Sequence, residues 1–379
     1  MTAEALSDNK TSPEKPTKYT RATIKTTAPT TTSTPIKERI LKHELEITAL
    51  LCSFTLLGYV SGFPIARKSV YLSYRVKHEN AVMYDKGPDD LYFVGFWVVA
   101  FTFLRAFVMR FIFHPLARLF DVKSYAKRQR FAEQASMFTY YTVFWTFGMN
   151  IMYHSPHWFD SSQYWIGYPH ILMSKRMKLY YLMQFAFWIQ QLYTIHIEKR
   201  RKDHFAMLSH HIITLVLISS SYYTNFTRIG NAVLCCMDFA DILLALAKML
   251  KYIGFSFVCD IAFGLFALAW PITRHGLFSM IIWSTTVEPE KYLDMKWEPE
   301  KGKYFTPFTQ KIYILLFILL NCLMFYWFAM IVKVIIKVLQ GNNAEDSRSD
   351  DEDEEDSIHV NEQKPTVKET LRKQEKRST

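Results

Sequence analysis

Eight long apolar runs, separated by short charged loops, constrain this chain more than any other feature of its sequence. A helix needs roughly 20 mainly apolar residues to cross the hydrocarbon core of a bilayer, and the runs come near that length. Backbone polar groups inside a bilayer must bond within the spanning structure, and runs of this length favour helices. The sequence therefore predicts an all-α polytopic membrane protein with about eight transmembrane helices. The runs cover residues 45–63, 91–113, 138–153, 180–197, 207–223, 231–250, 255–283 and 312–338.

The seventh run is the longest and carries Pro271 and Arg274. Proline removes a helical hydrogen bond, and irregular backbone at membrane depth requires protein or water beside it. We therefore expect this segment to be kinked, tilted or partly re-entrant.

Residues 1–44 form a polar arm rich in Thr, Pro and Lys, which predicts a disordered segment. The arm does not resemble a cleavable signal peptide, since no apolar core follows a short charged start. The first apolar run is therefore expected to act as the signal anchor. Eight Lys and Arg residues precede that run, and the positive-inside rule then predicts a cytosolic N-terminus. An even number of spans returns the C-terminus to the same side.

The charged loops agree with this topology only in part. Basic segments at residues 118–130 and 199–202 fall on the cytosolic side, as the rule requires. The Lys-rich loop at residues 288–311 falls on the opposite side and counts against the topology. Near the cytosolic end of the second run, Arg105 and Arg110 are expected to snorkel toward water.

The C-terminal tail, residues 341–379, contains the acidic run "SRSDDEDEEDS" and is predicted to be disordered. Ser347 and Ser349 each have an acidic residue three positions later, the pattern that kinases such as casein kinase 2 accept. The alternative is a tail that only improves solubility. Near the end of the chain, Lys376 and Arg377 match a dibasic endoplasmic-reticulum retrieval signal, which is read from the cytosol.

The formal charge of +10 is spread over loops and tails. It suits anionic lipid or a phosphorylated ligand better than nucleic acid, for which the sequence has no motif. The cysteines fall within the apolar runs without metal-type spacing, so we expect them to pack as small apolar side chains. They are Cys52, Cys235, Cys236, Cys259 and Cys322.

Two adjacent histidines, His210 and His211, begin an otherwise apolar run, where ionisable side chains are costly. Helical spacing aligns them with other polar residues on one face. That face is predicted to hold Asp203, Met207, His210, His211, Thr214 and Leu215. In the next run the same spacing aligns Asn231, Asp238, Asp241, Ala245 and Lys248.

These residue types allow three interpretations. The first is a structural ion-pair network, with Asp241 bonded to Lys248 or a histidine bonded to an aspartate across the helix pair. The second is catalysis, in which an imidazole takes a proton or attacks an acyl group while an aspartate orients it. The third is a metal site, which is disfavoured because adjacent histidines point apart and no further ligand completes a set. We therefore predict no metal.

The same stretch resembles the longevity-assurance motif of ceramide synthases, which lies within a TLC domain. The resemblance continues upstream through "FWIQQLYTIHIEKRRKD". The residues that carry it are Arg201, Asp203, Met207, His210, His211, Thr214, Ser221, Tyr222, Asn225, Arg228, Gly230, Asp238, Asp241 and Lys248. The resemblance implies a TLC catalytic domain at residues 130–340, with its last six or so helices bundled around a lipid cavity. Residues 45–129 would then form two N-terminal transmembrane helices with their loops.

The resemblance implies an enzyme of the endoplasmic-reticulum membrane that transfers a fatty acyl group from acyl-CoA to the amine of a sphingoid base, with no cofactor. The base would be dihydrosphingosine or phytosphingosine. The implied catalytic residues are His210, His211, Asp238 and Asp241, supported by the motif residues Asp203, Thr214, Tyr222, Asn225, Arg228 and Lys248. Either a histidine attacks the thioester to form an acyl-imidazole, which we favour, or it serves as general base for direct attack by the amine.

Two basic segments are candidates for binding the CoA phosphates, because guanidinium groups bind phosphate in a bidentate manner. They comprise Lys127, Arg128 and Arg130, and Lys199, Arg200, Arg201 and Lys202. The alternative is that both are solvated loops of the positive-inside type. The resemblance further implies a small single-span accessory subunit and a homodimer or a heterodimer with a paralogue. The competing hypothesis for the whole chain is a TLC protein that binds, senses or transfers lipid without chemistry.

Overall fold

In the computed structural model, which describes residues 42–78, 81–198 and 202–340, long helices lie side by side along one direction. Each of the eight apolar runs lies mainly in one long helix or in a helix continued by a π-helical segment, and the first run continues past α2 into the turn at residues 61–63. The long helices are α2 (Glu44–Val60), α4 (Asp90–Val108), α6 (Tyr125–Tyr153), α7 (Lys175–Ile197), α8 (His204–Tyr223), α9 (Thr227–Ile253), α10 (Ser256–Trp270) and α13 (Pro307–Leu339). The shorter helical segments are α3 (Pro64–Val70), η1 (Met109–Phe113), α5 (His114–Leu119), η2 (Ser161–Tyr164), η3 (Pro271–Leu277), α11 (Phe278–Val287), α12 (Pro289–Tyr292) and η4 (Pro299–Lys301).

By length and composition alone, four of the described helices suit a membrane crossing. A fifth is added if α2 and α3, which are bent by 116° at their junction, count as one span. Helices α6, α7 and α9 are long enough to cross, with 29, 23 and 27 residues. They carry buried polar residues such as Gln184 and Asn231, as expected where helices of a membrane bundle face one another. The chain is therefore an all-α multi-pass membrane protein.

The seventh run is neither broken nor re-entrant. α10, η3 and α11 form one helix of 32 residues, Ser256–Val287. The π-helical segment begins at Pro271, because a wider turn accommodates the missing hydrogen bond. The third run was predicted too short, since α6 begins at Tyr125 and carries charged residues in its first turns.

Local sequence signals set several helix ends. The hydroxyl groups of Ser174 and Thr306 each accept a hydrogen bond from the backbone N–H three residues later, at the starts of α7 and α13. Pro307 occupies the first turn of α13, where it loses no intrahelical bond. Gly254 ends α9 with φ at +86°, a conformation that glycine adopts without strain.

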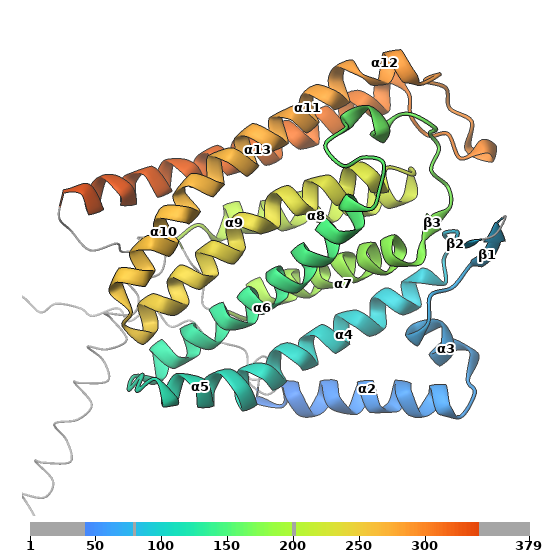
Figure 1. The fold of residues 1–379 in the computed structure, drawn as a ribbon. Helices are drawn as coiled ribbons and strands as arrows, with labels where there is room; N and C mark the ends of the chain where they lie inside the picture. The colour runs from blue at the N-terminus through green and yellow to red at the C-terminus, as the bar shows by residue number, and fades with distance from the viewer. Residues whose placement is uncertain (1–41, 79–80, 199–201, 341–379) are drawn as a thin grey trace, which may run out of the picture.

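The two ends of the bundle differ in character. We call the end at which α6, α8 and α10 begin the basic end, because the basic segment at residues 118–130, which joins α5 to α6, lies there. α2 begins toward this end and α13 terminates there (Figure 1). We call the opposite end the sheet end. It carries a small antiparallel sheet, β1 (Arg75–His78), β2 (Ala81–Tyr84) and β3 (Met173–Ser174), in the order β1-β2-β3.

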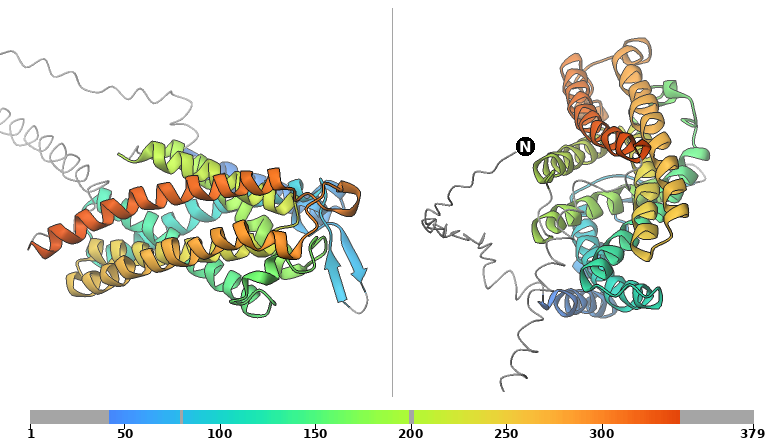
Figure 2. Two further views of the ribbon diagram at one scale, coloured as in Figure 1. Left: turned by 90° about the horizontal axis from the view of Figure 1, so that it is seen from above. Right: turned by 90° about the vertical axis from the view of Figure 1, so that its left-hand side faces the viewer.

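Helix α9 lies at the centre of the bundle and contacts α6, α7, α8, α10 and α11. In the end-on view of Figure 2, α2, coloured blue, lies on the outside of the bundle. α2 packs chiefly on α4, and most of its large apolar side chains are exposed. The interior between α8, α9, α11 and α13 is built mainly from aromatic and aliphatic side chains. This interior surrounds the polar residues of α8 and α9.

Candidate active site

Two adjoining cavities lie inside the bundle. A polar one of about 180 Å³, which we call the chamber, is bordered by α6, α7, α8, α9, α13 and η3 toward the basic end. An apolar one of about 50 Å³, which we call the slot, continues toward the sheet end. Trp188 and His210 line both. The charged and imidazole side chains on the chamber wall are Glu133, Glu198, Asp203, His204, His210, His211, Asp241, Lys248 and Arg274.

The histidine pair is held by aromatic rings. The His210 and His211 ring centroids lie 5.7 Å apart with planes at 62°. The ring of Trp188 stands edge-on to both, at 5.5 Å from His210 and 5.4 Å from His211. Trp327 of α13 contacts His210 at 5.5 Å. Nδ1 of each imidazole is buried, and within the described chain it has no hydrogen-bond partner. A ligand in the chamber can supply that partner.

Asp203 precedes α8 and is buried at 4 % exposure. Its Oδ2 accepts a hydrogen bond of 3.0 Å from the indole N–H of Trp327. Because the Trp327 ring also packs against His210, this bond links the carboxylate to the position of the imidazole. Sequence reasoning missed Trp327, since a tryptophan in an apolar run gives no sign of a polar partner.

Asp241 lies on the chamber wall and pairs with Arg274, with 2.7 Å between Arg274 Nη2 and Asp241 Oδ2. Arg274 also donates to the Met237 carbonyl at 2.7 Å and lies over the Trp270 ring at 3.9 Å. The predicted structural alternative paired Asp241 with Lys248. The structure pairs Asp241 with Arg274 of the neighbouring helical segment η3, and Lys248 also lines the chamber.

Asp238 lies outside both cavity linings. Its Oδ2 accepts from the Gln184 amide at 3.2 Å, and Gln184 in turn accepts from the Tyr140 hydroxyl at 2.7 Å. Among the described residues, the other carboxylate oxygen of Asp238, Oδ1, is buried and has no hydrogen-bond partner. Asn231, on the same predicted stripe, is bonded to the His157 ring at 3.1 Å. The stripe on α9 thus divides between the chamber and a buried polar network.

Three other motif residues lie at the sheet end, about 18 Å or more along the helix axis from His210 at 1.5 Å per residue. The Tyr222 hydroxyl donates to Asp90 at 2.8 Å. Asn225, in a left-handed turn with φ at +72°, donates to the Gly302 carbonyl at 2.8 Å. Arg228 donates to the Gln163 carbonyl at 2.6 Å. These contacts join loops at the sheet end, whereas Thr214 lines the slot.

A half-buried lysine, Lys86, completes the sheet-end contacts. Lys86 Nζ donates to the Tyr222 carbonyl at 3.0 Å and to the Asn225 side chain. Burial lowers the pKa of Lys86 to about 8. This cluster therefore ties the loop after β2 to the turn between α8 and α9.

The predicted phosphate-binding residues lie in different surroundings. Lys127 is exposed, and Arg128 donates to the carbonyls of Val122 and Lys123, where it caps the preceding turn. Arg130 is paired with Glu133 at 3.3 Å. Lys202 is exposed. Other predicted residues lie outside the described part of the chain, namely Lys199, Arg200, Arg201, Ser347 and Ser349.

Arg105 does not snorkel as predicted. It points into the protein and bonds to Glu198 at the end of α7, at 2.5 Å. Arg110 is exposed and lies 3.7 Å from Glu46. Over the residues that the structure describes, no three His, Cys, Asp or Glu side chains form a group able to hold a metal ion.

The TLC domain family model matches residues 130–333, more than half of the chain. A sphingosine N-acyltransferase of Schizosaccharomyces pombe is 39 % identical, with 87 % of this chain and 84 % of the relative covered. The chain belongs to the TLC-domain family of sphingosine N-acyltransferases. A ceramide synthase of Gibberella moniliformis is 36 % identical over 86 % of this chain and 84 % of its own. A ceramide synthase of Saccharomyces cerevisiae is 34 % identical, with 76 % of this chain and 70 % of the relative covered.

Membership in this family confirms the predicted class, an acyltransferase of the membrane. The matched region contains every residue that lines the chamber. In this acyltransferase the wall therefore offers two imidazoles, carboxylates from α8 and α9, and an apolar slot that begins at His210.

Proposed function

We propose that this acyltransferase is a ceramide synthase that transfers a fatty acyl group from acyl-CoA to the amine of dihydrosphingosine or phytosphingosine. The products are dihydroceramide or phytoceramide and free CoA. The observation that carries the proposal is the position of His210, where the polar chamber meets the apolar slot. Both substrates join a polar reacting group to a long apolar chain. A junction of this kind suits a polar reacting group together with the first part of the apolar chain attached to it.

The proposed chemistry follows from the unpartnered imidazole nitrogens. One imidazole, which we assign to His210, attacks the thioester carbon, and a C–N bond replaces the C–S bond as CoA thiolate leaves. The sphingoid amine, freed of its proton by a base, then attacks the acyl-imidazole and displaces the ring. His211 lies on the same wall and can take that proton. Asp203 and Asp241 place negative charge in the chamber, which stabilises the cations formed on either route.

The same proposal assigns Asp238 a positioning role through Gln184, because it contacts neither cavity. Location at the endoplasmic reticulum, with the basic end in the cytosol, follows from the positive-inside rule and the dibasic signal. The accessory subunit, dimerisation and phosphorylation of Ser347 and Ser349 by a casein kinase 2-like enzyme stay predictions.

The test compares His210→Ala and His211→Ala with His154→Ala, a control at an exposed histidine near the sheet end. Full-length protein in phosphatidylcholine nanodiscs is given acyl-CoA and dihydrosphingosine, and ceramide is measured by mass spectrometry. We expect loss of activity by about 100-fold or more at His210 or His211, the range of general acid–base catalysis, with the control unchanged. Full turnover in both variants would refute the site. Lipid binding by wild-type protein without any turnover would support the non-catalytic hypothesis.

The route is tested with acyl-CoA alone. Intact mass spectrometry should show an adduct of the acyl mass on wild-type protein and on His211→Ala, but not on His210→Ala. Sequential kinetics together with no adduct, under conditions that support turnover, would exclude the covalent route and leave general-base catalysis.

A further inference from the structure

A third, larger cavity of about 800 Å³ lies at the basic end, outside the chamber. We call it the basic groove. It is bordered by the start of α2, the end of α4 with η1 and α5, the first turns of α6 and the end of α7. Its charged and imidazole side chains are Lys42, Glu44, Arg105, Arg110, His114, Arg118, Arg130, Glu133 and Glu198. Five cationic side chains therefore face three carboxylates, which favours an anionic ligand.

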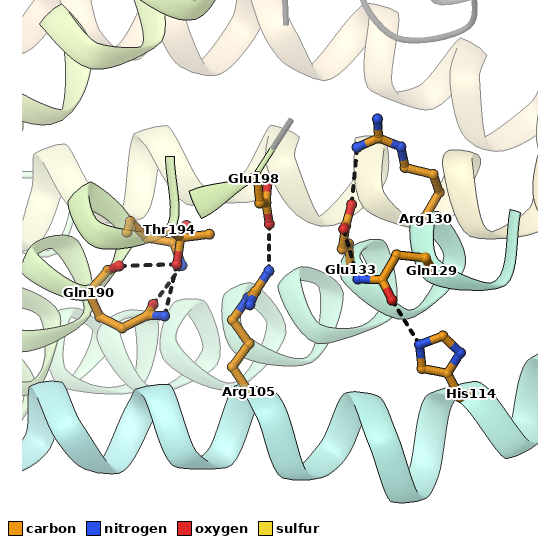
Figure 3. A network of polar contacts seen from close by, with 9 residues as sticks. Arg105, His114, Gln129, Arg130, Glu133, Gln190, Thr194 and Glu198 are labelled. Atoms are coloured by element: carbon orange, nitrogen blue, oxygen red, sulfur yellow. Dashed lines mark hydrogen bonds and ion pairs between the residues drawn. The ribbon is translucent and has the colours of Figure 1, made fainter. Parts of the chain in front are cut away.

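Two separate groups of polar contacts lie at the floor of the basic groove (Figure 3). Arg105 bonds to Glu198, and Arg130 bonds to Glu133. These four side chains are between 10 % and 19 % exposed. Gln129 extends the second group by donating to Glu133 at 3.1 Å and contacting the His114 ring at 2.9 Å. The two floor arginines are thus held in fixed positions at the bottom of the groove.

The rim carries the accessible charge. Arg110 and Arg118 are both exposed and lie about two turns apart on the helix formed by η1 and α5. The contact between Arg110 and Glu46 is 3.7 Å long, and more than half of each side chain is exposed. An exposed pair of this kind contributes little to stability, so a stronger anion can replace the carboxylate. Guanidinium groups at such a rim suit the planar, bidentate binding of phosphate.

The basic groove adjoins the chamber. Glu133 and Glu198 line both cavities. Along α7, ten residues separate Trp188, which contacts the histidine pair, from Glu198 at the groove, about 15 Å at 1.5 Å per residue. A ligand whose phosphates lie in the groove therefore needs an arm of about 15 Å between its phosphates and its reactive group to reach the histidines. Acyl-CoA, which carries its thioester on a flexible pantetheine arm beyond the diphosphate, has this architecture.

We propose that the basic groove binds the phosphate groups of the acyl donor, with Arg110 and Arg118 as rim contacts and Arg105 and Arg130 as fixed floor contacts. The proposal rests on the proposed function for the identity of the donor. It moves the phosphate site away from exposed Lys127 and Lys202 to the wall between α4, α5 and α6.

The test measures binding of CoA and of dephospho-CoA by calorimetry to full-length protein in phosphatidylcholine nanodiscs. Arg110→Gln/Arg118→Gln is compared with Lys337→Gln, which removes an exposed charge from the end of α13 away from the groove. We expect the double variant to raise the Kd for CoA about tenfold or more, which corresponds to about 1.4 kcal/mol, and the control to change it less than twofold. Dephospho-CoA, which lacks the 3′-phosphate, should bind wild-type protein more weakly than CoA does. The double variant should reduce the affinity for dephospho-CoA less than it reduces the affinity for CoA. Melting temperatures of the variants check that they fold.

Three results would overturn the proposal. One is unchanged CoA affinity in the double variant with acyl transfer intact, which leaves the proposed function standing. Another is a larger loss of affinity in Lys127→Gln than in the double variant, which places the phosphates on the exposed segment. The third is unchanged CoA affinity together with loss of the stabilisation that phosphatidylserine gives wild-type protein, which assigns the groove to a lipid headgroup. Failure of wild-type protein to bind CoA would instead defeat the proposed function.

Discussion

Replacing Arg274 by Met should destabilise the protein strongly, because it removes the guanidinium group that pairs with Asp241 inside the bundle. The Arg274 side chain is 5 % exposed and that of Asp241 is 25 % exposed. Breaking a buried ion pair costs about 3–5 kcal/mol. Because Asp241 is partly exposed, we take about 3 kcal/mol as the cost of breaking this ion pair. The lost hydrogen bond to the Met237 carbonyl adds about 1 kcal/mol. The expected change in the free energy of unfolding is about 4 kcal/mol.

The double variant Asp241→Asn/Arg274→Met removes both charges and should recover most of this loss. For a domain of roughly 300 residues, 1 kcal/mol corresponds to about 1.5 °C in melting temperature. We therefore expect a decrease of about 6 °C for Arg274→Met and about 2 °C for the double variant. Melting is followed by intrinsic fluorescence in nanodiscs at one fixed scan rate, since unfolding of such proteins is often irreversible.

The double-mutant cycle decides whether the pair acts as a unit. Asp241→Asn alone leaves a buried guanidinium and should cost about as much as Arg274→Met. If the two single losses add up in the double variant, with a coupling energy below about 0.5 kcal/mol, our account of the pair is wrong. Turnover in a folded double variant then shows whether the Asp241 charge also serves the chemistry.

Three further predictions concern other parts of the bundle. Trp327→Phe keeps a ring beside His210 but removes the donor to Asp203, so kcat/KM should fall about tenfold with little change in melting temperature. Gly230→Ala places a Cβ 1.8 Å from the Tyr181 hydroxyl and should lower the free energy of unfolding by about 1–3 kcal/mol. The control Gly264→Ala has open space around the added Cβ, so its melting temperature should be unchanged or higher. Burial lowers the pKa of Lys86 to about 8, so between about pH 8 and 10.5 the folded state releases this proton before the unfolded state does. Stability should therefore rise with pH in that window, and Lys86→Met should remove the rise.

The sequence determined the helical class and the approximate position of each long helix. Apolar runs of about the length of a bilayer leave the backbone few alternatives. Helical spacing also placed Asp203, His210 and His211 on one face of α8, and all three line the chamber. Motif residues alone carried the resemblance to ceramide synthases, and the family comparison confirmed it.

Only the tertiary structure decided which side chains meet. Trp327 reaches Asp203 across 124 positions of sequence, and Arg274 reaches Asp241 from another helix. In the tertiary structure Arg105 bonds to Glu198 and does not extend to the lipid boundary. Asp238 lies outside the chamber and bonds to Gln184, although it shares a predicted helix face with Asp241. Periodicity specifies the face of a single helix, but contacts between helices depend on their rotation and depth in the bundle. Packing of all the helices together fixes both, and no local pattern encodes them.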